Sequence, residues 1–175
     1  TLTQAQPCEG TSLLGEEFEN GIPVNWTVLD LNPNDTVYWS LEERGYTGAF
    51  QAFHFHGRKC VANTSMYMQP AQANDWLISP ATSLGSGPLC LSWMAAAMYN
   101  WGETYQVRIS TTTPTVSAFM SNPVLYTETN QPVSWVQRSV DLSAYSGQTV
   151  YIGFFYNSNA LWTQYFDDIR ITRPV

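Results

Sequence analysis

Frequent turn residues are the feature that most restricts what this chain can fold into. Glycine, proline and asparagine recur in stretches such as "GIP", "NPND", "HGR", "GSG" and "NWG", and the segments between them are short and rich in β-branched and aromatic residues. Segments of this kind are typical of β-strands, and their spacing is that of sandwiches and barrels. We therefore expect an all-β fold of about ten to twelve short strands. The expected strands cover residues 12–19, 24–31, 36–43, 48–55, 59–68, 74–84, 89–99, 103–113, 133–143, 148–158 and 161–173.

The apolar pattern indicates how two of these strands are buried. In the segment 103–113, Tyr105, Val107 and Ile109 alternate with polar residues, as in a strand with one buried face. In the segment 148–158 both faces are apolar, so we expect this strand at the centre of a sheet. One short helix is expected within residues 113–122, "TPTVSAFMSN".

Length and charge limit the domain organisation and the partners. The 175 residues suit one domain, with residues 1–11 as a linker or N-terminal lead-in and residues 12–175 as a single sandwich domain. The net charge of -7 is opposite in sign to that of proteins that follow a nucleic-acid backbone, so no nucleic-acid partner is expected. No apolar run of about 18 residues is present, so no membrane insertion is expected.

The three cysteines leave two interpretations open. Cys8, Cys60 and Cys90 form no C-x-x-C motif, which argues against zinc and thiol redox sites. Cys60 and Cys90 lie in strand-like segments, and the simplest interpretation is a pair of buried free thiols. Cys8 lies in the polar lead-in and could pair with either of them.

Two acidic clusters lie near opposite ends of the chain. Glu17 and Glu19 belong to the first expected strand, and Asp167 and Asp168 belong to the last. The first and last strands of a sandwich often lie side by side, which would bring two or three carboxylates together at one edge. Because carboxylates at close range repel one another, a hard cation such as calcium, which prefers oxygen ligands, is expected between them.

Other interpretations of the acidic residues remain open. The glutamates could face solvent while Asp167 caps a turn, or two carboxylates could form the acid/base pair of a glycosidase. A third oxygen-rich stretch, "DLNPND" at residues 30–35, resembles a calcium loop in composition. It lacks the glycine and the distal glutamate of an EF-hand.

Six segments occur in an order that resembles a known family. They are "EEFENGIPVNWTVLD", "NDWLISPATSL", "LCLSWMAAA", "ETYQVRIST", "VDLSAYSGQTVYIGFFY" and "FDDIRI". This order is similar to that of the cleaved-adhesin repeats, which are adhesin domains of gingipain-type surface proteins of Bacteroidetes. It is also similar to the choice-of-anchor J modules and, more distantly, to MAM-type domains. The resemblance extends roughly over residues 13–173.

The resemblance implies a jelly-roll β-sandwich of the galactose-binding-domain-like type, with an adhesive rather than a catalytic role. It also implies a secreted or cell-surface location, associated with the outer membrane. Family members commonly hold structural calcium between the first strand and the terminal Asp-Asp strand, which by motif position implies Glu19 and Asp168 as metal ligands first, then Glu17 and Asp167. Pro33 and the absence of glycine in residues 30–35 depart from the family pattern and argue against a second ion there.

Two expected loops combine tryptophan with amide side chains. Adhesion modules usually recognise ligands through loops at one end of the sandwich or through a concave face. Exposed aromatic rings suit sugars, because a ring stacks on the apolar face of a pyranose. The alternative is that these aromatic residues pack the rim of the core. The candidate ligand-binding residues are Tyr99, Asn100, Trp101, Asn157, Asn159 and Trp162.

A histidine pair is a further candidate site. His54 and His56 share one face of an expected strand, and this spacing can bind a transition metal or haem. No third ligand is evident, so ordinary surface or half-buried histidines are the alternative.

We expect a non-catalytic adhesion module that binds carbohydrate or a host or surface protein, is stabilised by calcium, and exists as a monomer or as part of a multidomain surface protein. No Ser-His-Asp order, Cys-His pair or H-E-x-x-H motif stands out, so no enzyme is expected. The alternatives are a structural accessory domain of a larger surface protein and a glycoside-active jelly-roll enzyme. The enzyme would need a cleft with two carboxylates about 5–10 Å apart.

Overall fold

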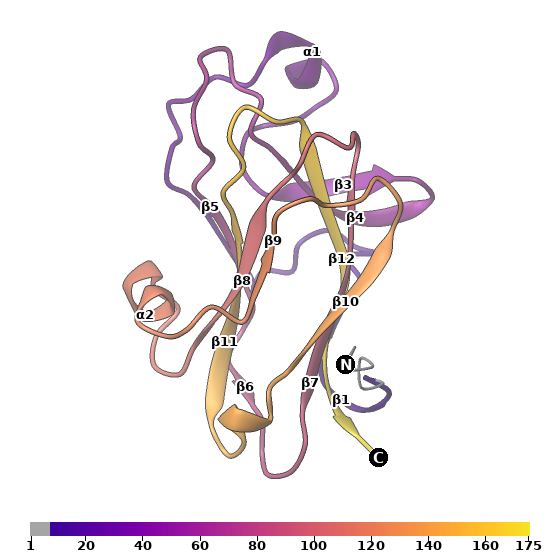
Figure 1. Ribbon diagram of the computed structural model, residues 1–175, viewed down its shortest axis with the longest axis vertical. Coiled ribbons are helices and arrows are strands. Elements are labelled where there is room, and N and C mark those ends of the chain that lie inside the picture. Colours follow the sequence, from indigo (N-terminus) through magenta and orange to yellow (C-terminus); the bar gives the residue numbers. More distant parts are fainter. Residues whose placement is uncertain (1–7) are drawn as a thin grey trace.

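Two antiparallel sheets stacked face to face form the architecture of the computed structural model, which describes residues 8–175 (Figure 1). This arrangement confirms the predicted all-β sandwich. The first sheet has the order β10-β7-β12-β4-β3, with β1 also paired to β12. Its strands are β1 (Gly10–Glu16), β3 (Gln51–Phe55), β4 (Arg58–Thr64), β7 (Cys90–Ala97), β10 (Val136–Asp141) and β12 (Thr163–Pro174).

The second sheet has the order β2-β5-β11-β8-β9, with β6 also paired to β11. The short edge strand β9 follows no strong apolar pattern and is absent from the expected set. The strands of this sheet are β2 (Thr27–Asp30), β5 (Asp75–Ile78), β6 (Thr82–Ser83), β8 (Tyr105–Ser110), β9 (Tyr126–Glu128) and β11 (Thr149–Tyr156).

The core between the sheets follows the predicted alternation. Tyr105, Val107 and Ile109 of β8 are all fully buried. Strand β11 lies between β5 and β8, which confirms its predicted central place. From β12, Tyr165, Ile169 and Ile171 enter the same core. Burial of these large side chains supplies the main free energy that holds the sheets together.

Strands β1 and β12 pair antiparallel, so the first and last strands are neighbours, as predicted. Glu16 lies opposite Ile169, and Gly10 lies opposite Pro174. A bulge interrupts β12 between Asp167 and Arg170 where it pairs with β7. Because a bulge adds a residue to one strand, it bends the strand and changes the direction of the side chains there.

The two short α-helices differ in how well the sequence predicts them. Helix α2 (Val116–Met120) lies inside the expected helical segment and confirms it. The expected strand over residues 36–43 is wrong, because part of it forms helix α1 (Trp39–Glu42). Leucine and glutamate are good helix formers, Leu41 is fully buried, and Gly45, at φ 90°, ends the turn in a conformation that favours glycine. A 3-10 turn, Ser143–Tyr145, precedes β11.

Helix α2 covers part of the outer face of the second sheet. Phe119 of this helix packs on Trp76 of β5, with ring centroids 5.3 Å apart, and Phe155 of β11 stacks on the same indole at 4.6 Å. Trp76 and Phe119 are fully buried in this small cluster, which is separate from the main core. The aromatic outer face of β11 is therefore partly covered by the chain itself, since Tyr151 and Phe155 are half-buried.

A disulfide joins Cys8 to Cys90, across a sequence separation of 82. The interpretation of Cys60 and Cys90 as two free thiols is therefore wrong for Cys90, and the alternative in which Cys8 takes a partner is confirmed. Cys60 is a free, buried thiol whose pKa is raised to about 12, chiefly by burial. The bond anchors the residues before β1 to β7.

The predicted domain boundary lies close to the start of β1. Residues 1–7 of the expected lead-in lie outside the described residues, and β1 includes Gly10 and Thr11, which the prediction placed in the lead-in. The single domain over residues 12–175 stays a prediction. Among the described residues, no helix is both long enough and apolar enough to cross a membrane.

Candidate functional site

The loops at one end of the sandwich bring the predicted aromatic residues together. The β7–β8 connection carries Tyr99 and Trp101, and the β11–β12 connection carries Trp162. These strands are parts of different sheets, so the loops meet where the two layers end, near the start of β12 in the upper part of Figure 1. We call Tyr99, Trp101 and Trp162 the aromatic site.

The three rings of the aromatic site contact one another. Tyr99 and Trp101 stack with centroids 4.6 Å apart and an interplanar angle of 25°. Trp162 lies 5.8 Å from each of them and is nearly perpendicular to Trp101, at 80°. Its indole Nε1 donates a hydrogen bond to Met98 Sδ at 3.1 Å, which helps to fix the orientation of the ring. The rings thus form a corner rather than a flat surface.

Much of this aromatic surface faces solvent. Trp101 is 54% exposed and Tyr99 is 41% exposed, while Trp162 is half-buried and also packs on the edge of the core. Large exposed aromatic groups are costly to leave in water, so clusters of them mark binding surfaces. The interpretation that these aromatics only pack the core rim therefore accounts for one face of Trp162 but not for Trp101.

The predicted amide residues have different roles. Asn157 is used within the fold: its backbone oxygen accepts a hydrogen bond from Gln72 Nε2 at 3.0 Å, and its Oδ1 accepts one from Thr104 Oγ1 at 3.3 Å. Asn159 forms a β-bridge with Gln72. Asn100 is exposed between the two aromatic residues of its loop. The side chains of Asn100 and Asn159 are therefore the exposed amides of the two loops, whereas Asn157 is bound within the fold.

A buried polar network that the sequence analysis missed supports these loops. Glu103 is buried beside the aromatic loop, and Tyr156 donates a hydrogen bond to its Oε2 at 2.7 Å. The Oγ atom of Ser65 connects this network to the second loop. It lies 3.3 Å from the Tyr156 hydroxyl and accepts a hydrogen bond from the Leu161 backbone N–H at 3.0 Å. Burial raises the pKa of Glu103. A glutamate between two strands carries no sequence signal of such burial.

The aromatic site is nearly free of charge. The loop residues 98–104 and 157–162 contain one ionisable acidic or basic side chain other than tyrosine, the buried Glu103. Asn100, Thr104 and the backbone supply the remaining polar groups. Such a surface has aromatic faces and neutral hydrogen-bonding groups, and it lacks a charged group that would select an ionic ligand.

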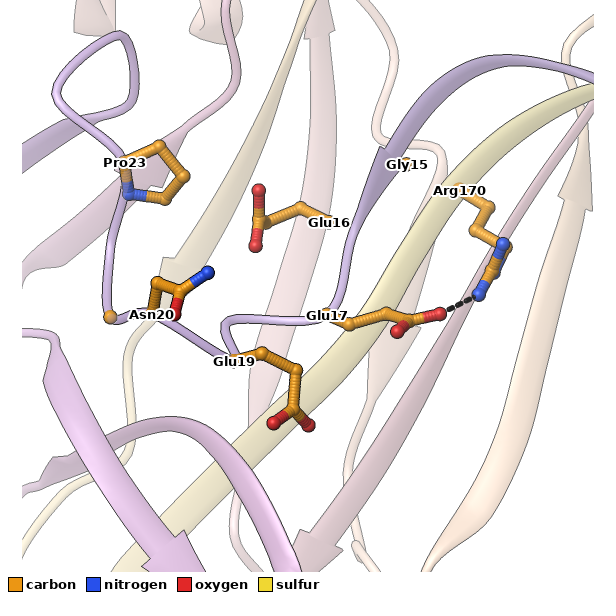
Figure 2. Close-up of a pocket in the computed structure, with 8 residues that line it drawn as sticks. Gly15, Glu16, Glu17, Glu19, Asn20, Pro23 and Arg170 are labelled. Atoms are coloured by element: carbon orange, nitrogen blue, oxygen red, sulfur yellow. Dashed lines mark hydrogen bonds and ion pairs between the residues drawn. The ribbon is translucent and has the colours of Figure 1, made fainter.

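A surface pocket of about 490 Å³ lies at the end of β1, beside the predicted calcium ligands. Strand β1 ends at Glu16, so Glu17 and Glu19 lie in the connection that follows it. The prediction that they belong to the first strand is therefore wrong. Their carboxylates diverge in Figure 2: Glu17 points toward Arg170, while Glu19 points away from it. Phe18 between them is buried, with φ 51°.

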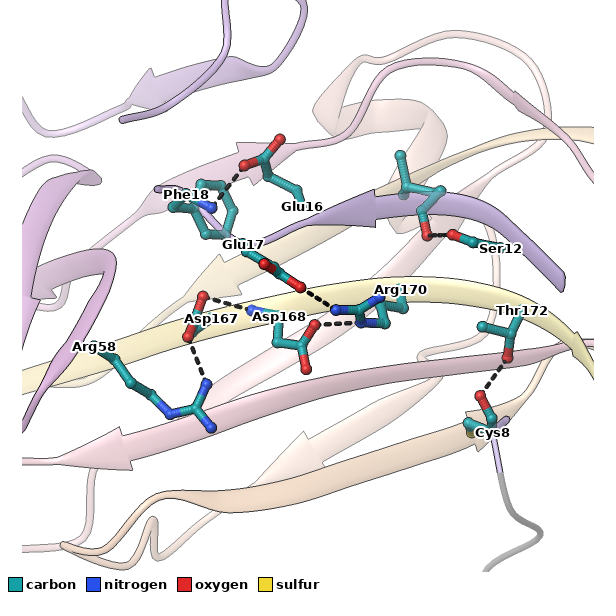
Figure 3. A network of polar contacts seen from close by, with 11 residues as sticks. Cys8, Ser12, Glu16, Glu17, Phe18, Arg58, Asp167, Asp168, Arg170 and Thr172 are labelled. Atoms are coloured by element: carbon teal, nitrogen blue, oxygen red, sulfur yellow. Dashed lines mark hydrogen bonds and ion pairs between the residues drawn. The ribbon is translucent and has the colours of Figure 1, made fainter. Parts of the chain in front are cut away.

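Arg170 joins the two acidic clusters. Its guanidinium contacts the carboxylates of Glu17 and Asp168 at the same time (Figure 3). Asp168 has φ 50° and lies in the bulge of β12, which brings its side chain to the same surface as Arg170. The structure therefore places Glu17 and Asp168 around one shared cationic group, which the chain itself supplies.

The other two predicted metal ligands also have basic partners. Arg58 binds Asp167 at 2.8 Å, and Lys59 lies 3.5 Å from Glu19. Asp167 is buried, and this burial raises its pKa although the Arg58 hydrogen bond opposes the shift. Within residues 8–175, no three histidine, cysteine, aspartate or glutamate side chains converge as a ready metal centre. Calcium at these four residues stays a prediction.

The predicted histidine pair is split between a strand and a turn. His54 lies on β3, whereas His56 lies beyond its end with φ 45° and stacks on Phe55 at 3.9 Å. The two side chains therefore do not share the face of one regular strand. Metal or haem binding by them stays a prediction.

Comparisons with known proteins agree with this architecture. A family model described as Cleaved Adhesin Domain matches residues 11–171. Hemagglutinin A of Porphyromonas gingivalis is 27% identical over 185 residues, which is 94% of this chain and 7% of the hemagglutinin. Lys-gingipain of the same organism is 27% identical over 179 residues, which is 93% of this chain and 10% of that protein. The chain thus spans about a tenth or less of the curated relatives it matches.

Solved structures show the same fold. A cleaved adhesin domain of Lys-gingipain superposes with a TM-score of 0.71 at 22% identity, covering 94% of this chain and 99% of that one. TmCBM61, solved in complex with β-1,4-galactotriose, superposes with a TM-score of 0.58 at 13% identity, covering 94% of this chain and 100% of that one. These likenesses confirm the jelly-roll sandwich.

Proposed function

Because this chain belongs to the Cleaved Adhesin Domain family, we propose that it is a non-catalytic adhesion module whose aromatic site binds neutral carbohydrate. The observation that carries this proposal is the corner that the exposed Trp101 and the half-buried Trp162 form at the end of the sandwich. A pyranose presents an apolar face to one ring and its hydroxyl groups to neighbouring amides. The corner can meet a sugar ring on two sides.

The chemistry around the aromatic site favours uncharged sugars. No arginine or lysine lies in its two loops, and these are the side chains that bind the carboxylate of an acidic sugar. A protein of related fold, TmCBM61, was solved with a neutral galactose oligomer, which supports carbohydrate as the ligand class. The family membership supports adhesion rather than catalysis.

A glycan array tests this proposal. We expect the wild-type chain to bind one or more neutral glycans, and Trp101→Ala and Trp162→Ala to weaken binding at least tenfold, which corresponds to about 1.4 kcal/mol. Trp39→Ala is the matched control, because Trp39 of α1 is exposed to the same degree, 53%, outside the two loops. Equal binding by the wild type and all three variants would contradict the proposal.

A protein surface is the second candidate ligand. Exposed tryptophan and tyrosine are the residues that most often anchor protein interfaces, so the same corner suits a protein partner. Adhesion to immobilised protein that is lost in Trp101→Ala, together with no binding on the glycan array, would favour this candidate. Absence of both activities in the wild type would leave the structural accessory role as the better explanation.

We also propose a calcium ion at the junction of β1 and β12. The guanidinium of Arg170 stands in for a cation there, since Glu17 and Asp168 already converge on it. In the calcium-bound form these two carboxylates would hold the ion, and Arg170 would turn toward solvent. A thermal melt of Asp168→Asn with and without chelator tests this: calcium should raise the melting temperature of the wild type more than that of the variant.

The location and the larger protein are also proposals. We propose that the chain is one domain of a secreted or cell-surface protein, since its relatives are far longer than the chain. Its partners would then be carbohydrates or proteins of another surface. Detection of the chain in the washed cell-surface fraction, with an antibody against this domain, tests the location.

A further inference from the structure

An apolar surface surrounds helix α1, at the end of the molecule away from the C-terminus (Figure 1). Trp39 of this helix is 53% exposed, and Met68, from the connection between β4 and β5, is 49% exposed. Tyr38 and Met66 are half-buried. Clusters of exposed apolar side chains mark sites of interaction. We call Tyr38, Trp39, Met66 and Met68 the α1 surface.

Backbone pairing beneath the α1 surface fixes the direction of its side chains. The Tyr38 backbone N–H donates to the Met66 carbonyl at 2.8 Å, next to an antiparallel bridge between Val37 and Tyr67. Val37 and Tyr67 are buried. Because successive side chains of paired extended segments alternate between the two faces, Tyr38, Met66 and Met68 point to the opposite, outer side.

Trp39 continues this surface onto the helix. The rings of Tyr38 and Trp39 have centroids 5.6 Å apart and are tilted by 39°. Leu41 is the side chain that α1 buries in the core, which leaves Trp39 facing solvent. Tryptophan and tyrosine supply much of the binding energy at protein interfaces, and methionine adapts its shape to a partner. The composition of the α1 surface is therefore typical of a protein-binding surface.

Two carboxylates lie beside Trp39. Glu42 and Glu43 follow it by three and four residues, positions that share one face of a helix, and the Glu43 N–H donates to the Trp39 carbonyl at 3.0 Å. Both glutamates are exposed, and neither takes part in an ion pair of the described residues. Arg44 is the one basic residue of the segment 36–47. The charge of this surface therefore favours a basic partner, as does the net charge of -7 on the whole chain.

A cavity of about 340 Å³ adjoins the α1 surface, and its lining includes Thr36, Val37, Glu42 and Tyr46. The Thr36 carbonyl accepts the Met68 backbone N–H at 2.7 Å, and Glu42 belongs to α1, so the cavity and the surface are continuous. Val37 and Tyr46 supply apolar walls, and Glu42 supplies a carboxylate. This combination suits a lysine or arginine side chain, which has an aliphatic stem and a charged end.

We propose that the α1 surface binds a basic segment of a partner protein, with a lysine or arginine side chain in the cavity and a neighbouring apolar side chain on Trp39 and Met68. The cationic group pairs with Glu42, and a second basic group can lie over the exposed indole next to Glu43. The proposal uses no residue of the aromatic site and does not depend on the function proposed for it. Trp39→Ala therefore remains a control for glycan binding.

A fluorescently labelled peptide of alternating lysine and leucine residues tests this proposal by fluorescence anisotropy. The matched probe is the same peptide with its lysines acetylated, which keeps the length of the peptide and removes its charge. We expect the wild-type chain to bind the lysine peptide at least tenfold more tightly than the acetylated one, a difference of about 1.4 kcal/mol. Trp39→Ala and the double variant Glu42→Gln/Glu43→Gln should each weaken binding of the lysine peptide by a similar factor.

Two control variants separate the α1 surface from the acidic character of the whole chain. Met120→Ala truncates a methionine of α2 that is 51% exposed, and it matches Met68→Ala at the α1 surface. Glu9→Gln/Asp141→Asn removes two exposed carboxylates outside this surface. Met68→Ala should weaken peptide binding, whereas both controls should leave it unchanged. Equal losses in the control and test variants would overturn the proposal, because they would show attraction to the net charge alone.

The remaining outcomes assign the α1 surface to another occupant. Equal binding of the two peptides, or binding of neither, rules out recognition of a basic segment. A molar mass that rises with protein concentration in light scattering, and no longer rises in Trp39→Ala, assigns the surface to a second copy of the chain. Sedimentation with vesicles of phosphatidylcholine and phosphatidylglycerol that Trp39→Ala abolishes assigns it to lipid. Each of these results overturns the proposal.

Discussion

The indole rings of Trp101 and Trp162 meet nearly at right angles, with their centroids 5.8 Å apart, although they come from loops that join different pairs of strands. This corner depends on the residues beneath it. Leu161, the neighbour of Trp162, donates its backbone N–H to Ser65, and Ser65 belongs to the network of Tyr156 and Glu103. The geometry of the aromatic site is thus connected to a buried carboxyl group.

Glu103→Ala should therefore destabilise the fold and loosen the aromatic site. The variant removes the closer of the two acceptors of the buried Tyr156 hydroxyl and leaves only Ser65 Oγ at 3.3 Å, which costs about 1–3 kcal/mol of unfolding free energy. Glu103→Gln keeps an acceptor oxygen and should cost less. Urea unfolding followed by tryptophan fluorescence measures both, and equal stabilities of the two variants would show that the hydrogen bond is unimportant.

Arg58→Met should cost far more stability than Lys59→Met, although the two residues are adjacent. The Asp167 side chain is only 5% exposed, and it loses its basic partner in the first variant. In the second pair, the side chains of Lys59 and Glu19 are 58% and 59% exposed. We expect about 1–3 kcal/mol for Arg58, because its own side chain is 40% exposed and partly screened by solvent, and under about 0.5 kcal/mol for Lys59. Chemical denaturation of both variants provides the comparison, and similar losses would contradict it.

Reduction of the Cys8–Cys90 disulfide should lower the unfolding free energy by about 2–4 kcal/mol, because the bond closes a long loop in the unfolded chain. The double variant Cys8→Ser/Cys90→Ser should show the same loss. Denaturation with and without dithiothreitol measures the effect. The double variant is also the control, since a reductant that still destabilises it would act somewhere other than on this bond.

Stability in the presence of chelator should fall as the pH rises from about 4 to about 8. The pKa of Asp75 in the folded state is raised to about 8 from 3.8, chiefly by burial, so the folded chain keeps a proton that the unfolded chain releases. Linkage then requires that the stabilisation present below pH 3.8 is lost as the pH approaches 8. Asp75→Asn should flatten this part of the pH profile, and an unchanged slope would assign it to other groups.

The sequence was sufficient for the parts of the fold that rest on local patterns. Alternation placed Tyr105 and Val107 in the core, and the doubly apolar pattern of residues 148–158 placed β11 at the centre of a sheet. The segment of α1 was misread because a single turn that buries one leucine leaves a pattern too short to distinguish from a strand.

The candidate sites were predictable only in part. Tyr99, Trp101 and Trp162 could be selected from their loop positions, but their contact depends on which loops the two sheets bring to the same end. The partners of the acidic residues were not predictable, because Arg58 and Asp167 meet only through the β4–β12 pairing. Asp75 looked like an ordinary strand residue, since burial without a partner leaves no local pattern.

The β1–β12 pairing has a consequence for how this domain would be displayed. Strand β12 begins beside Trp162 and ends opposite Gly10, so its 12 residues separate the aromatic site from both ends of the described chain. At about 3.3 Å per residue, that distance approaches 35–40 Å. In a longer polypeptide, the segments before and after this domain would therefore both connect at the end of the sandwich where Gly10 and Pro174 pair. Trp101 and Trp162 would lie at the opposite end, away from those connections.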